Sequence, residues 1–254
     1  MDDELKEIMR EAFGDSSSDD DCDSIDETAK IQSIFGESCC WEPITGINGL
    51  WICRDFLSPD QQSSLLFALE KEGYFAETSH NQAMRFGDLP CWAIELSYSI
   101  RENVLFSGCV PEFMDPITVG NNEKECPFPM DILWREPLFN QLIVNIYQPD
   151  EGICAHIDLM RFEDGIAIVS LESSCVMHFT RVGYETSHRE EMNEGCTRIP
   201  VLLIPGSLVF MWGEARYLWK HQINRKPGFQ MWEGQEIEQK RRTSVTLRRL
   251  CQTL

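Results

Sequence analysis

Short apolar runs separated by turn residues occupy most of the second half of the chain. Runs of about 4–8 residues that are rich in Val, Ile and Phe and end at Gly, Pro or charged residues are typical of β-strands. The sequence therefore predicts strands over residues 142–147, 166–171, 175–181, 201–203, 207–212, 217–223 and 244–250. Many short strands in succession favour a mainly β fold with flanking helices, in which two sheets pack together.

One amphipathic helix is predicted before these strands. Ser58 and Gln61 have the spacing of a capping box, and Pro59 suits the first helical position. Gly73 is expected to end the helix. The residues predicted to form its buried face are Leu65, Leu66 and Leu69. We expect this N-terminal helix to support the β fold without contributing to a functional site.

Residues 1–40 differ in kind from the rest of the chain. They contain 13 acidic and 3 basic residues, including the run DSSSDDDCDSIDE, and hold too little apolar surface to form a core. The sequence predicts an acidic, mostly disordered tail. Within it, one apolar stripe at helical spacing predicts a short helix: Leu5, Ile8, Met9, Ala12 and Phe13. This helix would either bind a protein partner or pack on its own chain, and both interpretations stay open.

Length and composition indicate how many domains the chain forms, whether it crosses a membrane and whether its cysteines are reduced. With 254 residues, of which 43% are hydrophobic, the chain can form one substantial domain, which we place at residues 41–254. No apolar run is long enough to cross a bilayer, so we expect no membrane partner and a location in the nucleus or cytoplasm. Eleven cysteines, an odd number without CxxC spacing, indicate reduced thiols.

The first candidate chemistry is a histidine and a carboxylate that lie two residues apart. His156 and Asp158 would share one face of an extended segment, where both can bind a single ion. His221, on a second predicted strand, could supply a third ligand. Two histidines and one carboxylate leave open coordination positions, as in non-haem Fe(II) oxygenases.

Two alternatives to an iron site must be weighed. The pair His156 and Asp158 could be a hydrogen-bonded core pair without a metal. A structural zinc site usually recruits cysteines in CxxC pairs, which this sequence lacks, and we do not count Cys154 as a ligand. The sequence therefore favours an open catalytic site over a closed structural one. His178 and His188 are poorer candidates for a ligand, and we expect His188 to lie on an exposed loop.

The C-terminal run RTSVTLR alternates polar and less polar positions, which predicts a strand with one polar face. The polar face would contain Arg242, Ser244, Thr246 and Arg248. A guanidinium group is a planar fork that suits a carboxylate, so two arginines at this spacing could bracket a dicarboxylate. Alternatively, this is a solvated basic edge strand.

Together these segments resemble a known family. The order NxYx(8)HxD, a distant His and RxxxxxR is similar to the AlkB family of Fe(II)- and 2-oxoglutarate-dependent dioxygenases, and the resemblance runs from about Trp41 to the C-terminus. Leu247 replaces the more usual Phe but should point away from the site. The segment GEARYLWKHQI resembles the branch that contains the tRNA wobble-uridine hydroxylases.

The resemblance implies a double-stranded β-helix, or jelly roll, with iron between its sheets. It implies that Arg242, helped by Tyr147, binds the distal carboxylate of 2-oxoglutarate. Arg248 and Asn145 would contact the end of 2-oxoglutarate nearer the metal, where O2 also reacts. The implied Fe(II) ligands are His156, Asp158 and His221.

The resemblance also implies a substrate lid, which we place at residues 76–136 and expect to mix loops with short strands. Candidate substrate contacts there are Met84, Arg85 and Phe86, because aromatic rings and Arg can stack on a flipped or single-stranded base. Trp92 is expected to belong to the core instead.

The expected reaction is oxidative demethylation or hydroxylation of a base in methylated or otherwise modified nucleic acid. The formal net charge is −20 and disfavours strong duplex binding, so RNA is preferred over duplex DNA. An alternative substrate is a protein side chain, and a third hypothesis is a noncatalytic protein that acts through its acidic tail. The residues that could form a local basic patch are Lys220, Arg225, Lys226, Lys240, Arg241 and Arg249.

Overall fold

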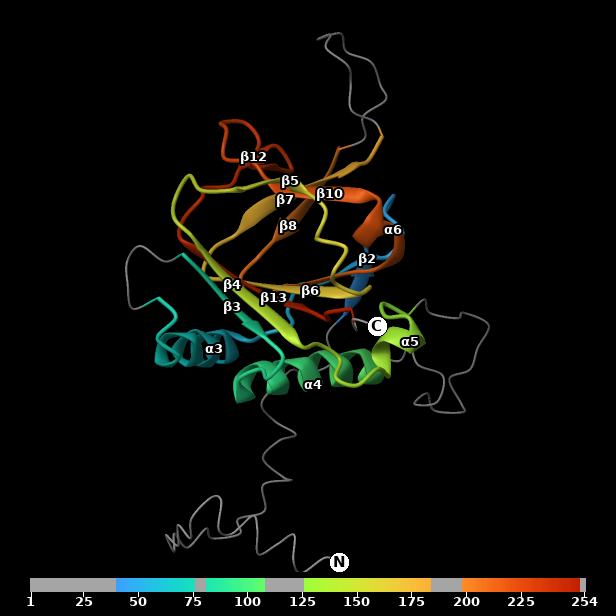
Figure 1. Cartoon of the computed structure of the whole chain (residues 1–254). Helices are drawn as coiled ribbons and strands as arrows, with labels where there is room; N and C mark the ends of the chain where they lie inside the picture. Colours follow the sequence, from blue (N-terminus) through green and yellow to red (C-terminus); the bar gives the residue numbers. More distant parts are fainter. Residues whose placement is uncertain (1–39, 76–80, 108–125, 184–197, 252–254) are drawn as a thin grey trace, which may run out of the picture. The chain divides into compact units, whose positions relative to one another are not determined.

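The computed structural model describes residues 40–75, 81–107, 126–183 and 198–251. Its larger sheet has seven strands in the order β1-β2-β9-β6-β13-β4-β3 (Figure 1). In that order the strands are β1 (Trp41–Pro43), β2 (Leu50–Cys53), β9 (Leu208–Met211), β6 (Ile166–Leu171), β13 (Arg242–Arg248), β4 (Gln141–Tyr147) and β3 (Gln82–Phe86). We call it the major sheet.

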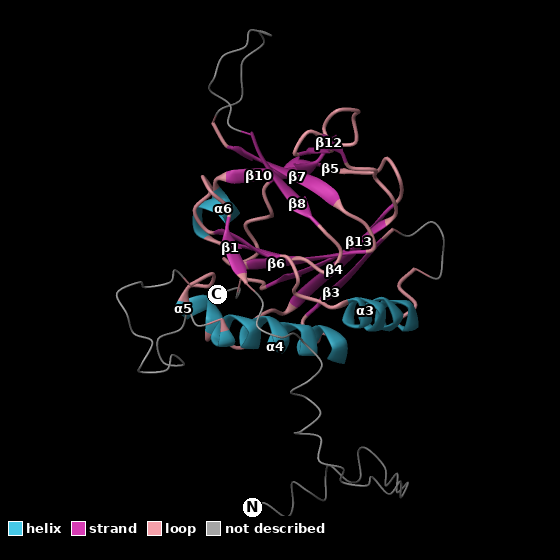
Figure 2. Ribbon diagram, turned by 180° about the vertical axis from the view of Figure 1, so that it is seen from behind, coloured by secondary structure: helices cyan, strands magenta, loops and turns pink. Residues whose placement is uncertain are grey.

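The smaller sheet, or minor sheet, has four strands in the order β5-β10-β7-β8. Its strands are β5 (Ile153–His156), β10 (Trp219–Ile223), β7 (Cys175–Arg181) and β8 (Arg198–Leu203). A separate hairpin pairs β11 (Met231–Trp232) with β12 (Gln235–Glu236). Figure 2 shows the minor sheet facing the major sheet, so the prediction of a mainly β, double-sheet fold is confirmed.

The helices are α3 (Pro59–Lys71), α4 (Cys91–Phe106), α5 (Met130–Leu133) and α6 (Gly213–Tyr217). Helices α3 and α4 cover the face of the major sheet that points away from the minor sheet (Figure 2). The predicted capping box is present, because the Ser58 side chain accepts from the Gln61 amide while Gln61 accepts from the Ser58 amide. Leu65 and Leu69 are buried as predicted.

Helix α4 corrects the interpretation of residues 76–136, for which only loops and short strands were expected. Its buried positions recur at helical spacing and pack into the core between the helices and the major sheet: Ala93, Leu96, Ile100 and Val104. Trp92 packs against the same core, as expected. This part of the predicted lid therefore supports the major sheet from the side opposite the minor sheet.

Strand alternation assigns the side chains of the major sheet to its two faces. Leu142 and Val144 of β4 belong to the core on the helix side, whereas Ile143 and Asn145 line a cavity between the sheets. Leu247 of β13 also faces the helix side, as predicted. Since successive strand residues point to opposite faces, the polar face of β13 is directed between the two sheets.

Three further expectations concern the acidic tail, the cysteines and membrane-spanning helices. The predicted tail and its apolar stripe, as well as His188, lie outside the described residues. Cys53 is disulfide-bonded, so the expectation of reduced thiols is wrong at this position. In the described part of the chain, no helix has the length and apolar content needed to span a membrane.

Ser58→Ala tests the predicted cap of α3. Without the hydroxyl the amide of Gln61 loses its acceptor, and we expect the free energy of unfolding to fall by about 1 kcal/mol. Urea denaturation followed by circular dichroism would measure this change. Ser63→Ala, inside the same helix, is the matched control and should cost less because Ala has the higher helix propensity. Equal losses in both variants would contradict the capping role.

Candidate active site

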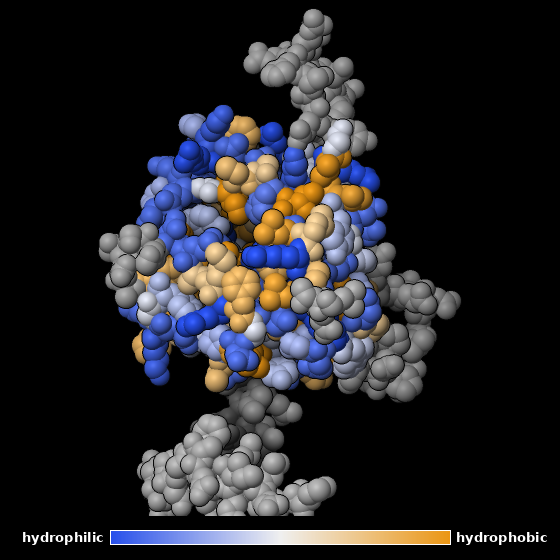
Figure 3. Space-filling view, in the orientation of Figure 1, coloured by the Kyte–Doolittle hydropathy of each residue, from blue (hydrophilic) through white to orange (hydrophobic). Residues whose placement is uncertain are grey.

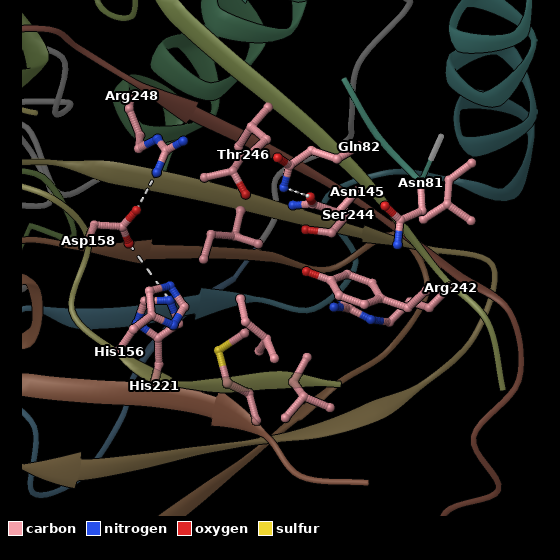
Figure 4. A pocket seen from close by; sticks show the side chains of 17 residues that line it. Asn81, Gln82, Asn145, His156, Asp158, His221, Arg242, Ser244, Thr246 and Arg248 are labelled. Carbon is pink, nitrogen blue, oxygen red and sulfur yellow. Dashed lines mark hydrogen bonds and ion pairs between the residues drawn. The ribbon is translucent and has the colours of Figure 1, made fainter. Parts of the chain in front are cut away.

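Two neighbouring strands of the minor sheet bring two histidines together. His156 at the end of β5 lies opposite His221 of β10, and their ring centroids are 4.2 Å apart. Asp158 follows β5 and turns toward the same point (Figure 4). One ligand atom from each of these three residues lies within 4.8 Å of the other two. The sequence predicted this cluster, and its donor set fits Fe(II) with positions left open.

Both histidines can offer a nitrogen lone pair to a metal ion. His156 Nδ1 lies 2.8 Å from the carbonyl oxygen of Cys154, to which it donates when protonated, and this leaves Nε2 available to an ion. His221 is buried, and desolvation together with nearby His156 lowers its pKa to about 4. Its imidazole is therefore neutral at physiological pH, as a metal ligand requires.

Asp158 is held ionised by its neighbours. Burial acts to raise its pKa, but His221 and Arg248 outweigh this effect and hold the pKa below its usual value. Arg248 forms an ion pair with Oδ1, while Oδ2 lies 3.7 Å from His221 Nε2. The carboxylate thus has one oxygen fixed by an arginine and the other directed toward the histidines.

Arg248 is itself fixed by a residue that the sequence did not single out. Its Nε donates to Gln141 Oε1 at 2.7 Å, and Gln141 lies opposite Arg248 in the pairing of β13 with β4. Gln141 is fully buried and donates to the carbonyl of Leu142 at 2.8 Å. A polar residue inside an apolar strand was the available signal, since a buried amide needs partners.

The other end of the cavity is formed by Arg242, which is almost completely buried (Figure 4). Its guanidinium carbon lies 4.6 Å from the ring centroid of Tyr147, and its Nη1 donates to the Ser170 hydroxyl at 3.4 Å. Within the described residues no carboxylate forms an ion pair with Arg242. A buried cation without a counter-ion favours an anionic ligand at this end.

Between the two ends the cavity has a volume of about 300 Å³, at the small end of the range for ligand sites. Ser244 and Thr246 of β13 line it as the sequence predicted. Gln82 of β3 was missed; its Nε2 donates to Asn145 Oδ1 at 2.6 Å, which leaves the Asn145 amide nitrogen to donate to a ligand. The apolar wall consists of Ile143, Ile153, Ile168, Met177 and Ile223.

Arg216 of α6 was also not predicted from the sequence. Its side chain is almost fully buried and donates to the carbonyl oxygens of Asp158, Leu159 and Phe162 at 2.9, 2.8 and 3.2 Å. These bonds fix the loop that follows Asp158. The side chain thereby connects the segment carrying His221 to the segment carrying Asp158.

The three predicted substrate contacts on β3 lie on two different faces of the strand. Met84 lies opposite Ile143, which lines the cavity, so Met84 and Phe86 occupy the inter-sheet face of β3. Arg85 points to the other face, where its Nε lies 3.4 Å from the hydroxyl of Tyr74. Arg85, which was predicted to contact substrate, therefore does not face the cavity.

Two arginines of the predicted basic patch are paired with acidic residues. Arg249 is buried, lies 3.3 Å from Glu163 and donates to the carbonyl of Pro137. Arg241 forms an ion pair with Glu172. These arginines were read from sequence as surface charges, but acidic neighbours on adjacent segments neutralise them.

The remaining expectations for this site agree with the structure. His178 is buried near Phe229, with a ring-centroid distance of 6.3 Å, and does not belong to the cluster. Cys154 is exposed and does not line the cavity.

Comparison with known proteins identifies the class. A family model described as the 2OG-Fe(II) oxygenase superfamily matches residues 49–248, and the chain belongs to this superfamily. More particularly it is AlkB-like, and it is a 2-oxoglutarate-dependent dioxygenase that uses Fe(II), 2-oxoglutarate and O2.

Two relatives and one solved structure illustrate the similarity. The chain is 28% identical over 195 residues to "tRNA (carboxymethyluridine(34)-5-O)-methyltransferase alkbh8" of Xenopus tropicalis, which covers 74% of this chain and 27% of the relative. It is 27% identical over 212 residues to "Alkylated DNA repair protein ALKBH8 homolog" of Arabidopsis thaliana, with 80% and 59% covered. "The structure of OsALKBH1" has 16% identity and a TM-score of 0.49, with 79% and 96% covered.

His221→Ala tests the metal cluster. Loss of a first ligand should weaken Fe(II) binding by more than the roughly 10–100-fold that follows loss of an outer partner. Anaerobic titration with Fe(II) measures the dissociation constant, and Mn(II) can replace it in an oxygen-insensitive assay. His178→Ala is the matched control, because this histidine is also buried but lies outside the cluster. Wild-type affinity in the His221 variant would contradict the assignment.

Proposed function

We propose that this protein oxidises a modified base in RNA, by N-demethylation or by hydroxylation of a carbon atom. One observation supports the underlying site: a cavity joins the cluster of His156, Asp158 and His221 at one end to the buried Arg242 at the other, and Arg242 has no carboxylate partner among the described residues. These are the two features that an iron-bound 2-oxo acid requires.

In this proposal His156, Asp158 and His221 hold the Fe(II). When bound, Fe(II) couples the oxidation of 2-oxoglutarate by O2, which gives succinate and CO2, to the oxidation of a C–H bond. Arg242 binds the distal carboxylate, and burial raises the pKa of the adjacent Tyr147 hydroxyl, which therefore stays protonated as a donor. The result is a fixed end for a flexible dicarboxylate.

Arg248 near the metal and Asn145 in the middle of the cavity complete the orientation of the 2-oxo acid. Arg248 keeps Asp158 ionised and adds positive charge beside the cluster. Asn145 offers the amide nitrogen that Gln82 leaves available. The apolar wall excludes water from the middle of the cavity, so the fixed donors act in a medium of low dielectric constant.

Two considerations support RNA as substrate. The names of the Xenopus and related proteins refer to position 34 of tRNA, although this chain spans only 27% of the Xenopus relative. In addition, several described arginines outside the cavity form ion pairs with acidic residues, and the formal net charge is −20. This excess of negative charge disfavours the binding of nucleic-acid duplexes, which needs many contacts between basic residues and phosphates.

The two possible reactions give different products. Oxidation of an N-methyl group would release formaldehyde, whereas oxidation of a carbon substituent would leave a hydroxyl.

A protein side chain is the second candidate substrate. The observation that favours it is the net charge of −20, since a nucleic-acid-binding protein usually carries a patch of basic residues. Incubation of the wild-type protein and a His156→Ala/Asp158→Ala variant with total tRNA and with a peptide library separates the two substrates. Mass spectrometry of nucleosides should show a mass change that requires intact ligands; a change confined to peptides would overturn the RNA proposal.

Arg242→Ala should raise the requirement for 2-oxoglutarate. The variant leaves a buried carboxylate unpaired, a defect that typically costs about 3–5 kcal/mol and thus raises KM by about 100-fold or more. Succinate release in the absence of a second substrate measures this KM. The matched control is Arg241→Ala, because Arg241 is adjacent in sequence but does not line the cavity. Similar KM values in the two variants would show that Arg242 does not bind the co-substrate.

A further inference from the structure

Large apolar side chains are exposed at the metal end of the cavity. On β3, Met84 and Phe86 are 47% and 48% exposed, and on the loop after Asp158, Leu159 and Met160 are 60% and 63% exposed. Figure 3 shows hydrophobic residues gathered in the middle of the face on which the two sheets open. Clustered exposed apolar groups are typical of a binding surface.

The position of these residues follows from the strand register. Phe86 lies opposite Gln141, and Gln141 lies opposite Arg248, so Phe86 and Arg248 occupy one rung of the major sheet. Strands are about 4.8 Å apart, which puts Phe86 about 10 Å from Arg248 on the same face. Arg248 pairs with Asp158, from which the loop continues. The loop residues therefore directly follow a candidate metal ligand, and Phe86 lies on the same rung as the arginine that pairs with this ligand.

Arg161 joins the loop to the strand. Its guanidinium carbon lies 5.5 Å from the ring centroid of Phe86 and 5.0 Å from that of Phe162. The side chain of Arg161 is exposed, and no acidic residue in the described part of the chain forms an ion pair with it. We call Met84, Phe86, Leu159, Met160 and Arg161 the contact rim.

The backbone beneath the contact rim is firmly held. Arg216 donates to the carbonyls of residues 158, 159 and 162. Cys251 completes the set, because its amide donates to the carbonyl of Arg161 at 2.9 Å and its thiol lies 3.5 Å from the carbonyl of Met160. Every carbonyl from 158 to 162 thus accepts a hydrogen bond. An apolar surface on a fixed backbone loses little conformational entropy when it binds a partner.

We propose that the contact rim binds single-stranded RNA, with an unpaired base stacked on the pair of Arg161 and Phe86. The proposal rests on the proposed function and specifies how its substrate is held. Arginine and phenylalanine both offer flat faces to a base, and stacking needs no basic footprint. The contact rim has one cation, which is too few for the phosphate contacts of a duplex. Recognition by stacking is thus compatible with an acidic protein.

Fluorescence anisotropy with a labelled, uridine-containing 10-nucleotide RNA tests the proposal, using the full chain with Mn(II) and 2-oxoglutarate. Wild type should bind the single strand more tightly than the same RNA in a duplex. Phe86→Ala and Arg161→Ala should each weaken single-strand binding by about 10-fold. Arg161→Lys should not restore it, because an ammonium group keeps the charge without the flat face.

Phe67→Ala is the matched control. This phenylalanine is also exposed but belongs to α3, on the other side of the major sheet, and its removal should leave RNA affinity unchanged. Succinate release without RNA should be unchanged in the Phe67 variant, and circular dichroism with thermal unfolding checks that the Phe86 and Arg161 variants remain folded. RNA binding by wild type that is equal in the Phe86 and Arg161 variants would overturn the contact rim while leaving the proposed function intact. If tRNA nucleosides are not oxidised and wild type does not bind RNA, both proposals fail.

Discussion

The ion pair between Arg248 and Asp158 is the interaction on which the active site depends. It joins the central part of the major sheet to the segment that leaves the minor sheet, and so sets how the two sheets meet at the metal cluster. Both partners are buried, and a buried pair is favourable only if the remaining hydrogen-bonding groups are also satisfied. Gln141 accepts from Arg248 Nε, and Arg216 donates to the backbone carbonyl of Asp158. The geometry of the site is thus supported by polar groups on the major sheet and on α6.

The cavity follows from strand alternation in β4 and β13. One face of each strand carries Leu and Val against the helices, and the other carries Asn, Tyr, Ser, Thr and Arg between the sheets. A shift of one residue in register would exchange the two faces. The apolar core on the helix side therefore also determines which polar side chains meet the ligand, and the function of the site and the stability of the fold depend on the same register.

The sequence predicted the local parts of this arrangement well. The patterns in β6 and β7 had clear boundaries, and His156, Asp158, His221 and the polar face of β13 were recognised from period-two spacing. Contacts between distant segments could not be predicted. Arg249 resembles a surface charge until the chain folds it against Glu163, and Arg216 reveals its role only through carbonyls about 55 residues earlier. Helix α4 was missed because its buried stripe is narrow and contains serine.

Arg216 binds the loop after Asp158 through protein atoms alone, so this loop does not need an ion to take its shape. If the contact rim binds RNA, the metal-free protein would bind it too. Molecules that lack iron would then compete with active ones for the same transcripts and release them unmodified. Iron scarcity would consequently lower modification twice, by reducing the number of active molecules and by occupying their substrate.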